Sequence, residues 1–284
     1  MKPGSAILLA IAKRIPRGSF RIMRFAAQRD PALQDLSLPL QDIPFALRAD
    51  LRESVYATLF RRGSIPHQRG LDLVCRRALR PGDVVYDVGA NVGYTTALFA
   101  HCVGTGGRVV SVEPSPRTFA LLARSLERNA GNVTLLNLGL SDTEGQLTFY
   151  VPPSLDLASF VPVAGAEEMQ VRVSTLDALS AAHGHPRFVK VDVEGHEPGV
   201  LAGAAATLQR DDRPMVVFEA LVPALLERCV GLLSELGREG YRFRRIRNDG
   251  TLVAVGAPGS SDYIAIPAWA AARLGEVRDA GDAA

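Results

Sequence analysis

Three ionisable residues, Lys190, Asp192 and Glu194, alternate with valines in and just after the apolar segment 188–193. In an extended strand, side chains two residues apart share a face, so the charges would lie on one face and the valines on the other. Buried charges are costly unless they are paired. The pattern indicates either a structural ion-pair network or a functional site, and we favour the functional site. Glu219 ends another apolar segment and would add a carboxylate at the same edge.

A second chemistry-bearing segment runs from Val84 to Gly93. It has an apolar stretch that contains Asp87, followed by the turn residues Gly89, Ala90, Asn91, Val92 and Gly93. Glycines let a ligand approach the backbone closely, and open α/β sheets bind ligands at the carboxyl ends of their strands. The turn fits neither the G-x-G-x-x-G nicotinamide fingerprint nor the P-loop. Asp87 is suited to the ammonium group of a sulfonium cofactor, directly or through water.

Glu113 ends the next apolar segment, and Pro114 follows it. A carboxylate there can accept hydrogen bonds from both hydroxyls of a ribose, while the proline can pack on a purine. After the third segment, Ser141 and Asp142 come at the same edge, where Asp142 can accept from an adenine amino group. These features predict a nucleoside cofactor. Both NAD and S-adenosylmethionine contain adenosine, and the missing pyrophosphate-binding glycine pattern favours S-adenosylmethionine.

From residue 81 onward, short apolar segments alternate with longer amphipathic ones, which indicates a mostly parallel sheet with crossover helices. The expected strands are 84–88, 108–113, 133–138, 188–193 and 215–219, and the expected helices are 94–102, 116–129 and 221–236. Segments 146–151 and 170–173 alternate like exposed antiparallel strands and predict an insertion near 143–173. Segments 241–246 and 251–255 predict an antiparallel hairpin, and 263–266 a further short strand.

Residues 1–80 are less regular, and we expect them to form a helical extension with helices at 45–61 and 70–79. This extension precedes the domain at 81–268 and could cover its working edge as a substrate lid. The basic stretch from Lys13 to Arg24 is expected to be a solvated, poorly ordered arm, with an anionic partner as the alternative. The tail at 269–284 is expected to fray.

The composition is that of an ordinary globular chain: 284 residues, 47% hydrophobic, 22% charged and a net charge of +2. It excludes fibrous, disordered and disulfide-rich classes. No apolar segment reaches the roughly 18 to 20 residues that a membrane span needs. The three cysteines show no CxxC spacing, so we expect free thiols, no cysteine zinc site and a cytoplasmic location. The absence of zinc-finger, helix-turn-helix and RNP patterns argues against nucleic-acid binding.

Over roughly residues 81–246, the chain resembles the FkbM family of S-adenosylmethionine-dependent methyltransferases. The matching motifs are Asp87–Tyr94, Glu113-Pro114, Ser174–Asp177, Lys190–Glu197, and Arg213-Pro214 with Glu219. The D-x-E-G-x-E block is the family's most characteristic stretch. The resemblance implies a class I Rossmann-like methyltransferase fold with a seven-stranded sheet and helices on both faces. It also implies O-methylation of a hydroxyl on a small-molecule secondary metabolite or carbohydrate.

A hydroxyl is a poor nucleophile until it loses its proton. We therefore expect Asp192 or Glu194 to accept that proton or to hydrogen-bond the hydroxyl, with Lys190 keeping the carboxylates ionised. Glu219 and Glu197 are further candidates for this role. A divalent cation held by Asp192, Glu194 and Glu219 is possible, but no ligand spacing requires it.

Three alternatives remain open at this point. N-methylation of an amine on the same scaffold comes second, while an NAD-dependent oxidoreductase and a non-enzymatic nucleoside-binding protein come far behind. Two histidines, His67 and His196, are weaker candidates for the site. In this family the position of His196 is often occupied by a small residue, so the resemblance assigns it no role. The sequence does not indicate the acceptor or the oligomeric state.

Overall fold

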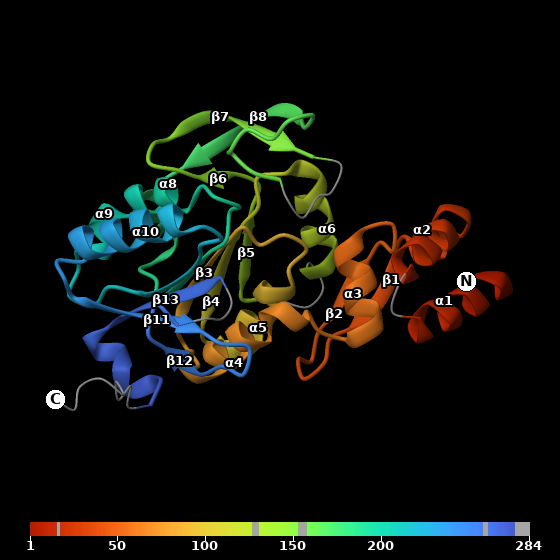
Figure 1. Ribbon diagram of the computed structural model, residues 1–284, viewed down its shortest axis with the longest axis horizontal. Coiled ribbons are helices and arrows are strands. Elements are labelled where there is room, and N and C mark those ends of the chain that lie inside the picture. The colour runs from red at the N-terminus through yellow and green to blue at the C-terminus, as the bar shows by residue number, and fades with distance from the viewer. Residues whose placement is uncertain (16–17, 127–130, 153–157, 258–260, 276–284) are drawn as a thin grey trace.

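The computed structural model describes residues 1–15, 18–126, 131–152, 158–257 and 261–275. Its centre is an eight-stranded sheet in the order β12-β11-β13-β10-β9-β3-β4-β5 (Figure 1). The strands are β3 (Val84–Val88), β4 (Arg108–Val112), β5 (Val133–Leu136), β9 (Phe188–Val191), β10 (Met215–Glu219), β11 (Tyr241–Ile246), β12 (Leu252–Val253) and β13 (Asp262–Pro267). Strands β5, β4, β3, β9 and β10 pair in parallel, whereas β13 is antiparallel to both its neighbours.

The chain order along this sheet reverses at β3. From β3 the chain runs through α5 (Tyr94–Val103) to β4, and through α6 (Pro116–Leu126) to β5 at the sheet edge. It later returns on the other side of β3 as β9. In open α/β sheets the crevice at such a reversal, outside the carboxyl ends of the strands, is where ligands bind. The topology therefore brings the ends of β3, β4 and β9 to one place.

Alternate residues of the strands face two separate apolar cores. Val85, Val109 and Phe188 pack in the core that contains α5, and Tyr86 and Val189 pack in the other. The second core is covered by α7 (Leu176–His183), α8 (Glu197–Ala202), α9 (Ala205–Leu208) and α10 (Pro223–Leu236). Figure 1 shows α8, α9 and α10 together on one side of the sheet. The expected Rossmann-like α/β fold with helices on both faces is confirmed.

The predicted insertion forms a small sheet of its own, in the order β6-β8-β7. It comprises β6 (Gly139–Leu140), β7 (Gly145–Val151) and β8 (Glu167–Ser174), and β7 pairs antiparallel with β8 as predicted. Figure 1 shows this small sheet at the top of the molecule, next to the carboxyl ends of the central strands.

The N-terminal region differs most from the prediction. It contains α1 (Pro3–Arg14), α2 (Ser19–Arg29), η1 (Pro31–Leu33), β1 (Leu36–Pro39), β2 (Ala46–Ala49), α3 (Ser54–Arg62), η2 (Pro66–Gln68) and α4 (Arg69–Ala78). The prediction that the basic stretch from Lys13 to Arg24 is a poorly ordered arm was wrong, because its described residues belong to α1 and α2, two helices that pack on each other. The helix expected at 45–61 was wrong in its first half, since 46–49 pair with β1. The helix at 70–79 is confirmed, within a residue, as α4.

The C-terminal part of the chain differs from the prediction in two further respects. The hairpin at 241–255 is confirmed, but its second strand, β12, extends the central sheet to eight strands rather than seven. The tail does not fray at once, because Ala268–Arg273 form a 3₁₀ helix in which the Trp269 indole donates to the Arg213 carbonyl at 2.8 Å. Residues 276–284, and the expected end of helix 116–129, lie outside the described residues. No helix in the described ranges is long and apolar enough to cross a membrane.

Phe188 offers a test of the core beneath the site. Its ring is fully buried at the start of β9 and meets Phe99 of α5 edge to face, with ring centroids 5.6 Å apart. We expect Phe188→Ala to lower the free energy of unfolding by about 3–5 kcal/mol, because the substitution leaves a cavity between sheet and helix. Urea denaturation measures this loss. Leu221→Ala, at a side chain that is 62% exposed, is the control and should change stability little; an equal loss in both variants would contradict this packing.

Candidate functional site

A cavity of about 610 Å³ lies at the carboxyl ends of β3, β4 and β9. Its size is within the range of small-molecule sites. It is lined by two groups that the sequence predicted, the turn after β3 and the charged segment after β9. The predicted residues in its wall are Gly89, Ala90, Asn91, Glu113, Pro114, Lys190, Asp192, Glu194 and Glu219. The fold therefore brings these four separate segments of the sequence to one cavity.

Gly89 is required by the close approach of two loops. Its φ is +80°, and a Cβ atom there would lie 1.9 Å from the carbonyl oxygen of Asp192. The backbone amides of Gly89 and Ala90 both donate to the Val112 carbonyl at 3.0 Å, which fixes the turn against β4. The glycine thus lets the turn after β3 pack directly on the charged segment after β9.

A buried lysine links the two predicted motifs. Asp87 and Lys190 are register partners on the adjacent strands β3 and β9. The Lys190 Nζ lies 3.7 Å from Asp87 Oδ1 and 3.0 Å from Asp192 Oδ2, and it donates to the Gly89 carbonyl at 3.4 Å. Burial alone would lower the pKa of Lys190, but the carboxylates of Asp192 and Asp87 outweigh it and raise that pKa. Lys190 is therefore a permanent cation in the cavity wall.

Asp87 itself lies behind this wall and is fully buried. Its Oδ2 accepts a hydrogen bond from the Thr96 hydroxyl at 2.6 Å, and Thr96 accepts in turn from Ser111 at 3.0 Å. Burial raises the pKa of Asp87, whereas Lys190 and Thr96 oppose that shift. These contacts tie β3, α5 and β9 together, so Asp87 holds Lys190 in place from the interior of the protein.

Glu113 closes the turn after β3 from the side of β4. Its Oε2 accepts from the Asn91 amide at 3.0 Å, and its Oε1 accepts from the Ser115 amide at 2.9 Å. Asn91 has a left-handed φ of +48°, which aims its amide at the carboxylate. Burial raises the pKa of Glu113 to about 7, against the lowering effect of the two amides. Glu113 therefore organises the turn while its carboxylate reaches the cavity.

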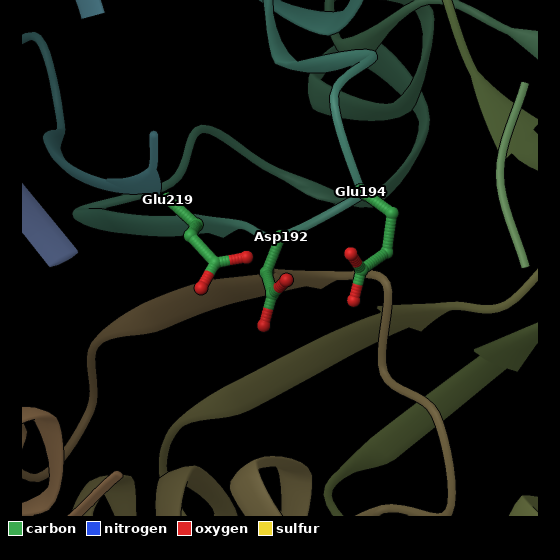
Figure 2. Close-up of side chains that lie close together, drawn as sticks. All are labelled: Asp192, Glu194 and Glu219. Carbon is green, nitrogen blue, oxygen red and sulfur yellow. The ribbon is translucent and has the colours of Figure 1, made fainter. Parts of the chain in front are cut away.

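Three carboxylates face a common space at the other end of the cavity. Asp192, Glu194 and Glu219 each offer an oxygen within 4.8 Å of the others, and Figure 2 shows the three side chains pointing into the same space. Burial, followed by the charges of Asp192 and Glu219, raises the pKa of Glu194 to about 7. Burial and Asp192 also raise the pKa of Glu219, whose Oε1 accepts from the Ser261 hydroxyl at 2.8 Å. This spacing of hard oxygen ligands is compatible with a divalent cation.

Asp262 belongs to the same acidic group and was missed by the sequence analysis. It is the register partner of Glu219 on β13, and it lines the cavity with Ser261. Burial, and then the charges of Asp192 and Glu219, raise its pKa to about 7. Its sequence signal was weak, because a lone Asp before a short apolar segment looks like a turn residue. Only the antiparallel pairing of β13 with β10 brings it to the site.

The N-terminal region supplies part of the cavity wall. Ser54, Val55 and Thr58 of α3 line it, together with Ile65, His67 and Gln68 from the segment before α4. This segment is fixed to the domain through α4, where the Asp72 carboxylate accepts from the Tyr94 hydroxyl at 2.6 Å. Of the two candidate histidines, His67 lines the cavity and His196 does not.

Several predicted residues lie outside the wall. Ser141, Asp142 and Gly93 are absent from the cavity lining, and Gly139 and Leu140 occupy the position expected for the serine and aspartate. The Ser141 hydroxyl donates to Asp142 at 3.1 Å and contacts His196 Nε2 at 3.1 Å. His196 also packs on the Phe160 ring, and burial lowers its pKa. This serine–histidine group supports the small sheet from behind the cavity.

Glu197, the last acid of the D-x-E-G-x-E block, also has a structural position. Its side chain is 1% exposed, and its Oε1 accepts from the amides of Val193 at 3.0 Å and Gly195 at 3.3 Å. These bonds hold the turn in which Glu194 adopts a left-handed φ of +54°. Glu197 therefore aims Glu194 into the cavity, and it does not line the cavity itself.

The contact between the two loops can be tested with a matched pair of glycines. Gly82 and Gly89 both have positive φ, +90° and +80°, but a Cβ atom at Gly82 would meet nothing within 4 Å. Gly82→Ala should therefore cost about 1 kcal/mol of unfolding free energy from backbone strain alone. Gly89→Ala should cost about 1–3 kcal/mol more, because the Asp192 carbonyl must move. Denaturant titration of both variants measures the difference, and equal losses would show that the loops are not in contact.

The chain is similar in sequence to known methyltransferases. A hexuronic acid methyltransferase, AglP, from Haloferax volcanii is 35% identical over 45% of this chain and 52% of its own length. The 31-O-demethyl-FK506 methyltransferase FkbM from Streptomyces tacrolimicus is 41% identical over 44% of this chain and 60% of its own. The chain thus spans between half and two thirds of these relatives.

Among solved structures, the methyltransferase FkbM from Methylobacillus flagellatus aligns with 93% of this chain and 58% of its own, at 18% identity and a TM-score of 0.48. The Methyltransferase FkbM domain matches residues 87–243, which is more than half of the chain and includes the turn after β3 and the charged segment after β9. The protein therefore belongs to the FkbM methyltransferase family.

Proposed function

We propose that the protein is an S-adenosylmethionine-dependent O-methyltransferase whose acceptor is a hydroxyl of a small-molecule secondary metabolite or carbohydrate. The observation that carries this proposal is one continuous cavity. It joins the turn after β3 and Glu113, which suit a nucleoside, to the carboxylates of Asp192, Glu194 and Glu219, which suit an acceptor. Family membership supports the reaction type.

The residues at one end of the cavity fit the cofactor. Gly89, Ala90 and Asn91 expose backbone beside Glu113, whose carboxylate is suited to the ribose hydroxyls, and Pro114 offers an apolar surface for the purine. Burial favours the neutral form of Glu113, and the amides of Asn91 and Ser115 favour the charged form that accepts hydrogen bonds. When bound, S-adenosylmethionine supplies an electrophilic methyl group on a sulfonium.

The carboxylates at the other end would receive the proton of the acceptor. Glu194 is the best placed, because it lies in the wall and its pKa of about 7 makes it a stronger base than an ordinary carboxylate. Asp192 and Glu219 would orient the hydroxyl and hold the negative charge near it. Lys190 lies 3.0 Å from Asp192 Oδ2, and the charge of Asp192 in turn helps to raise the pKa of Glu194.

The N-terminal region would serve as the lid over this reaction. Val55 and Thr58 of α3 and His67 add a wall opposite the domain. A wall of this kind excludes water and holds the acceptor oxygen in line with the transferable group, and orientation supplies much of the rate in a displacement reaction. We therefore propose that residues 1–80 set acceptor specificity while residues 81–268 hold the cofactor.

The names of two relatives are consistent with a sugar or a secondary metabolite as the acceptor. The names of AglP and FkbM describe methylation of a hexuronic acid and of a demethylated FK506 oxygen. The alternative is N-methylation, because an acidic group would also bind a protonated amine. Mass spectrometry of the product from an acceptor that carries both a hydroxyl and an amine distinguishes O-methylation from N-methylation.

A divalent cation at Asp192, Glu194 and Glu219 would polarise the hydroxyl, but the proposed proton transfer does not depend on one. A nucleic-acid substrate has no support from the sequence, and the three free cysteines favour a cytoplasmic location.

Calorimetric titration tests the cofactor. We expect micromolar binding of S-adenosylmethionine and S-adenosylhomocysteine, and no binding of NAD. Glu113→Gln should weaken binding by about 10-fold or more, since an amide cannot accept from both backbone amides and also serve the ribose. Glu235→Gln, on the exposed face of α10, is the control and should bind like the unmodified protein. Binding of NAD alone would overturn the proposed activity.

The pH dependence of turnover tests the base. With an acceptor found by screening sugars, uronic acids and macrolide alcohols, kcat/KM should rise with pH and level off above about 7, because the Glu194 carboxylate must be ionised to accept a proton. Glu194→Gln should lower kcat by about 10²–10⁴-fold and leave cofactor binding intact. Glu168→Gln, an exposed residue of β8, is the control. A full rate in Glu194→Gln would remove this residue from the mechanism.

A further inference from the structure

The first 29 residues carry a segregated positive charge that the proposed methyl transfer does not use. They contain seven basic and no acidic side chains, whereas the other 255 residues contain 25 basic and 30 acidic ones. The seven are Lys2, Lys13, Arg14, Arg17, Arg21, Arg24 and Arg29. A positive field concentrated at one end of a molecule attracts an anionic partner.

Helix α1 within this segment is apolar on two opposite faces. One face is buried through Leu9 and Ala12, where α1 packs on α2 and α3. Ile7 and Ile11 lie one turn apart on the other face and are 63% and 45% exposed. A helix that is apolar all round is normally covered on every side. The exposed isoleucines therefore mark a face suited to a further apolar contact.

Helix α2 adds a third exposed apolar side chain, and this one lies beside exposed cations. Phe25 is 47% exposed, and the Arg29 guanidinium lies 3.6 Å from the centre of its ring. Arg21 and Arg24 are exposed on the same helix. Figure 1 shows α1 and α2 side by side at the end of the molecule farthest from the C-terminal helix. Apolar side chains and cations thus occur together on this helix pair.

Three kinds of partner could cover the exposed side chains of α1 and α2: a second copy of the chain, a nucleic acid or an anionic lipid surface. The combination of positive charge with exposed apolar side chains favours one of them. A second copy of the chain would bring seven more positive charges against the first seven, which disfavours a dimer through α1 and α2. A nucleic acid would satisfy the arginines but would leave Ile7 and Ile11 without an apolar partner. An anionic lipid surface provides both an apolar contact and negative charge. Its acyl chains would contact the isoleucines, and its headgroups would bind the lysines and arginines.

We propose that α1 and α2 dock the protein on an anionic membrane surface, with Ile7 and Ile11 inserted at the level of the headgroups. This is peripheral contact, and it requires no spanning helix. Helix α3 packs on α1 and α2 and carries Ser54, Val55 and Thr58 of the cavity wall. The docking face therefore lies one helix away from the cavity. The proposal is independent of the methyl-transfer chemistry.

Co-sedimentation with lipid vesicles tests the proposal on the whole chain. The probes are vesicles of phosphatidylcholine alone and of phosphatidylcholine mixed with phosphatidylglycerol. We expect binding to the mixed vesicles, little binding to phosphatidylcholine alone, and release by high salt, because lipid charge supplies part of the affinity. The double variant Ile7→Glu with Ile11→Glu should bind at least about 10-fold more weakly, since it loses the apolar contact. Arg21→Glu with Arg24→Glu should also lose binding.

The matched control is Leu221→Glu with Val222→Glu, which places the same acidic residues at side chains that are 62% and 55% exposed elsewhere. It should retain vesicle binding. Circular dichroism and S-adenosylhomocysteine titration show whether each variant is folded, and they test the proposed function separately. The proposal is overturned if the unmodified protein does not bind anionic vesicles. It is also overturned if the double variant Ile7→Glu with Ile11→Glu binds them as tightly as the unmodified protein. Tight binding to duplex DNA that survives those substitutions would assign the charge to nucleic acid, and self-association that they abolish would assign the face to a second copy.

Discussion

The site depends on one buried ion group, Asp87–Lys190–Asp192. Lys190 is 3% exposed, and a lysine there is tolerated only because two carboxylates and the Gly89 carbonyl surround it. Asp87 belongs to β3 and Asp192 follows β9, so the group fastens together two motifs that line the cavity. Gly89 permits this contact, because any larger residue would collide with the Asp192 carbonyl. The turn after β3 and the charged segment after β9 are thus positioned by the same charges.

The buried carboxyls of the cavity wall make the stability of the fold depend on pH. The pKa values of Glu113, Glu194 and Asp262 are each raised to about 7, because these carboxyls are buried near other charges. The folded protein therefore binds their protons more tightly than the unfolded chain does. Their stabilising effect is full below the unfolded pKa of about 4 and is lost as pH rises through about 7. Near neutral pH the fold must hold partly ionised carboxylates together, and Lys190 is the cation that offsets this repulsion.

Much of the domain was predictable, because its signals are local. The ends of β3 and β10 agree with the apolar segments, and the two-residue period placed Lys190 opposite Val189 and Val191. The errors arose where tertiary contacts decide. Residues 46–49 have helix-compatible side chains but pair with β1, and Asp262 reaches the site only through the pairing of β13 with β10. Ser141 and Asp142 follow β6 and do not line the cavity, so their predicted role in cofactor binding stays a prediction.

The central claim is that one cavity holds a nucleoside cofactor at the turn after β3 and an acceptor at the carboxylates after β9. A crystal structure of the protein with S-adenosylhomocysteine tests it most directly. We expect the ribose hydroxyls to lie within hydrogen-bonding distance of Glu113 and the sulfur to face the space between Asp192, Glu194 and Glu219. A nucleoside bound elsewhere, or one whose sulfur faces away from these three carboxylates, would contradict it.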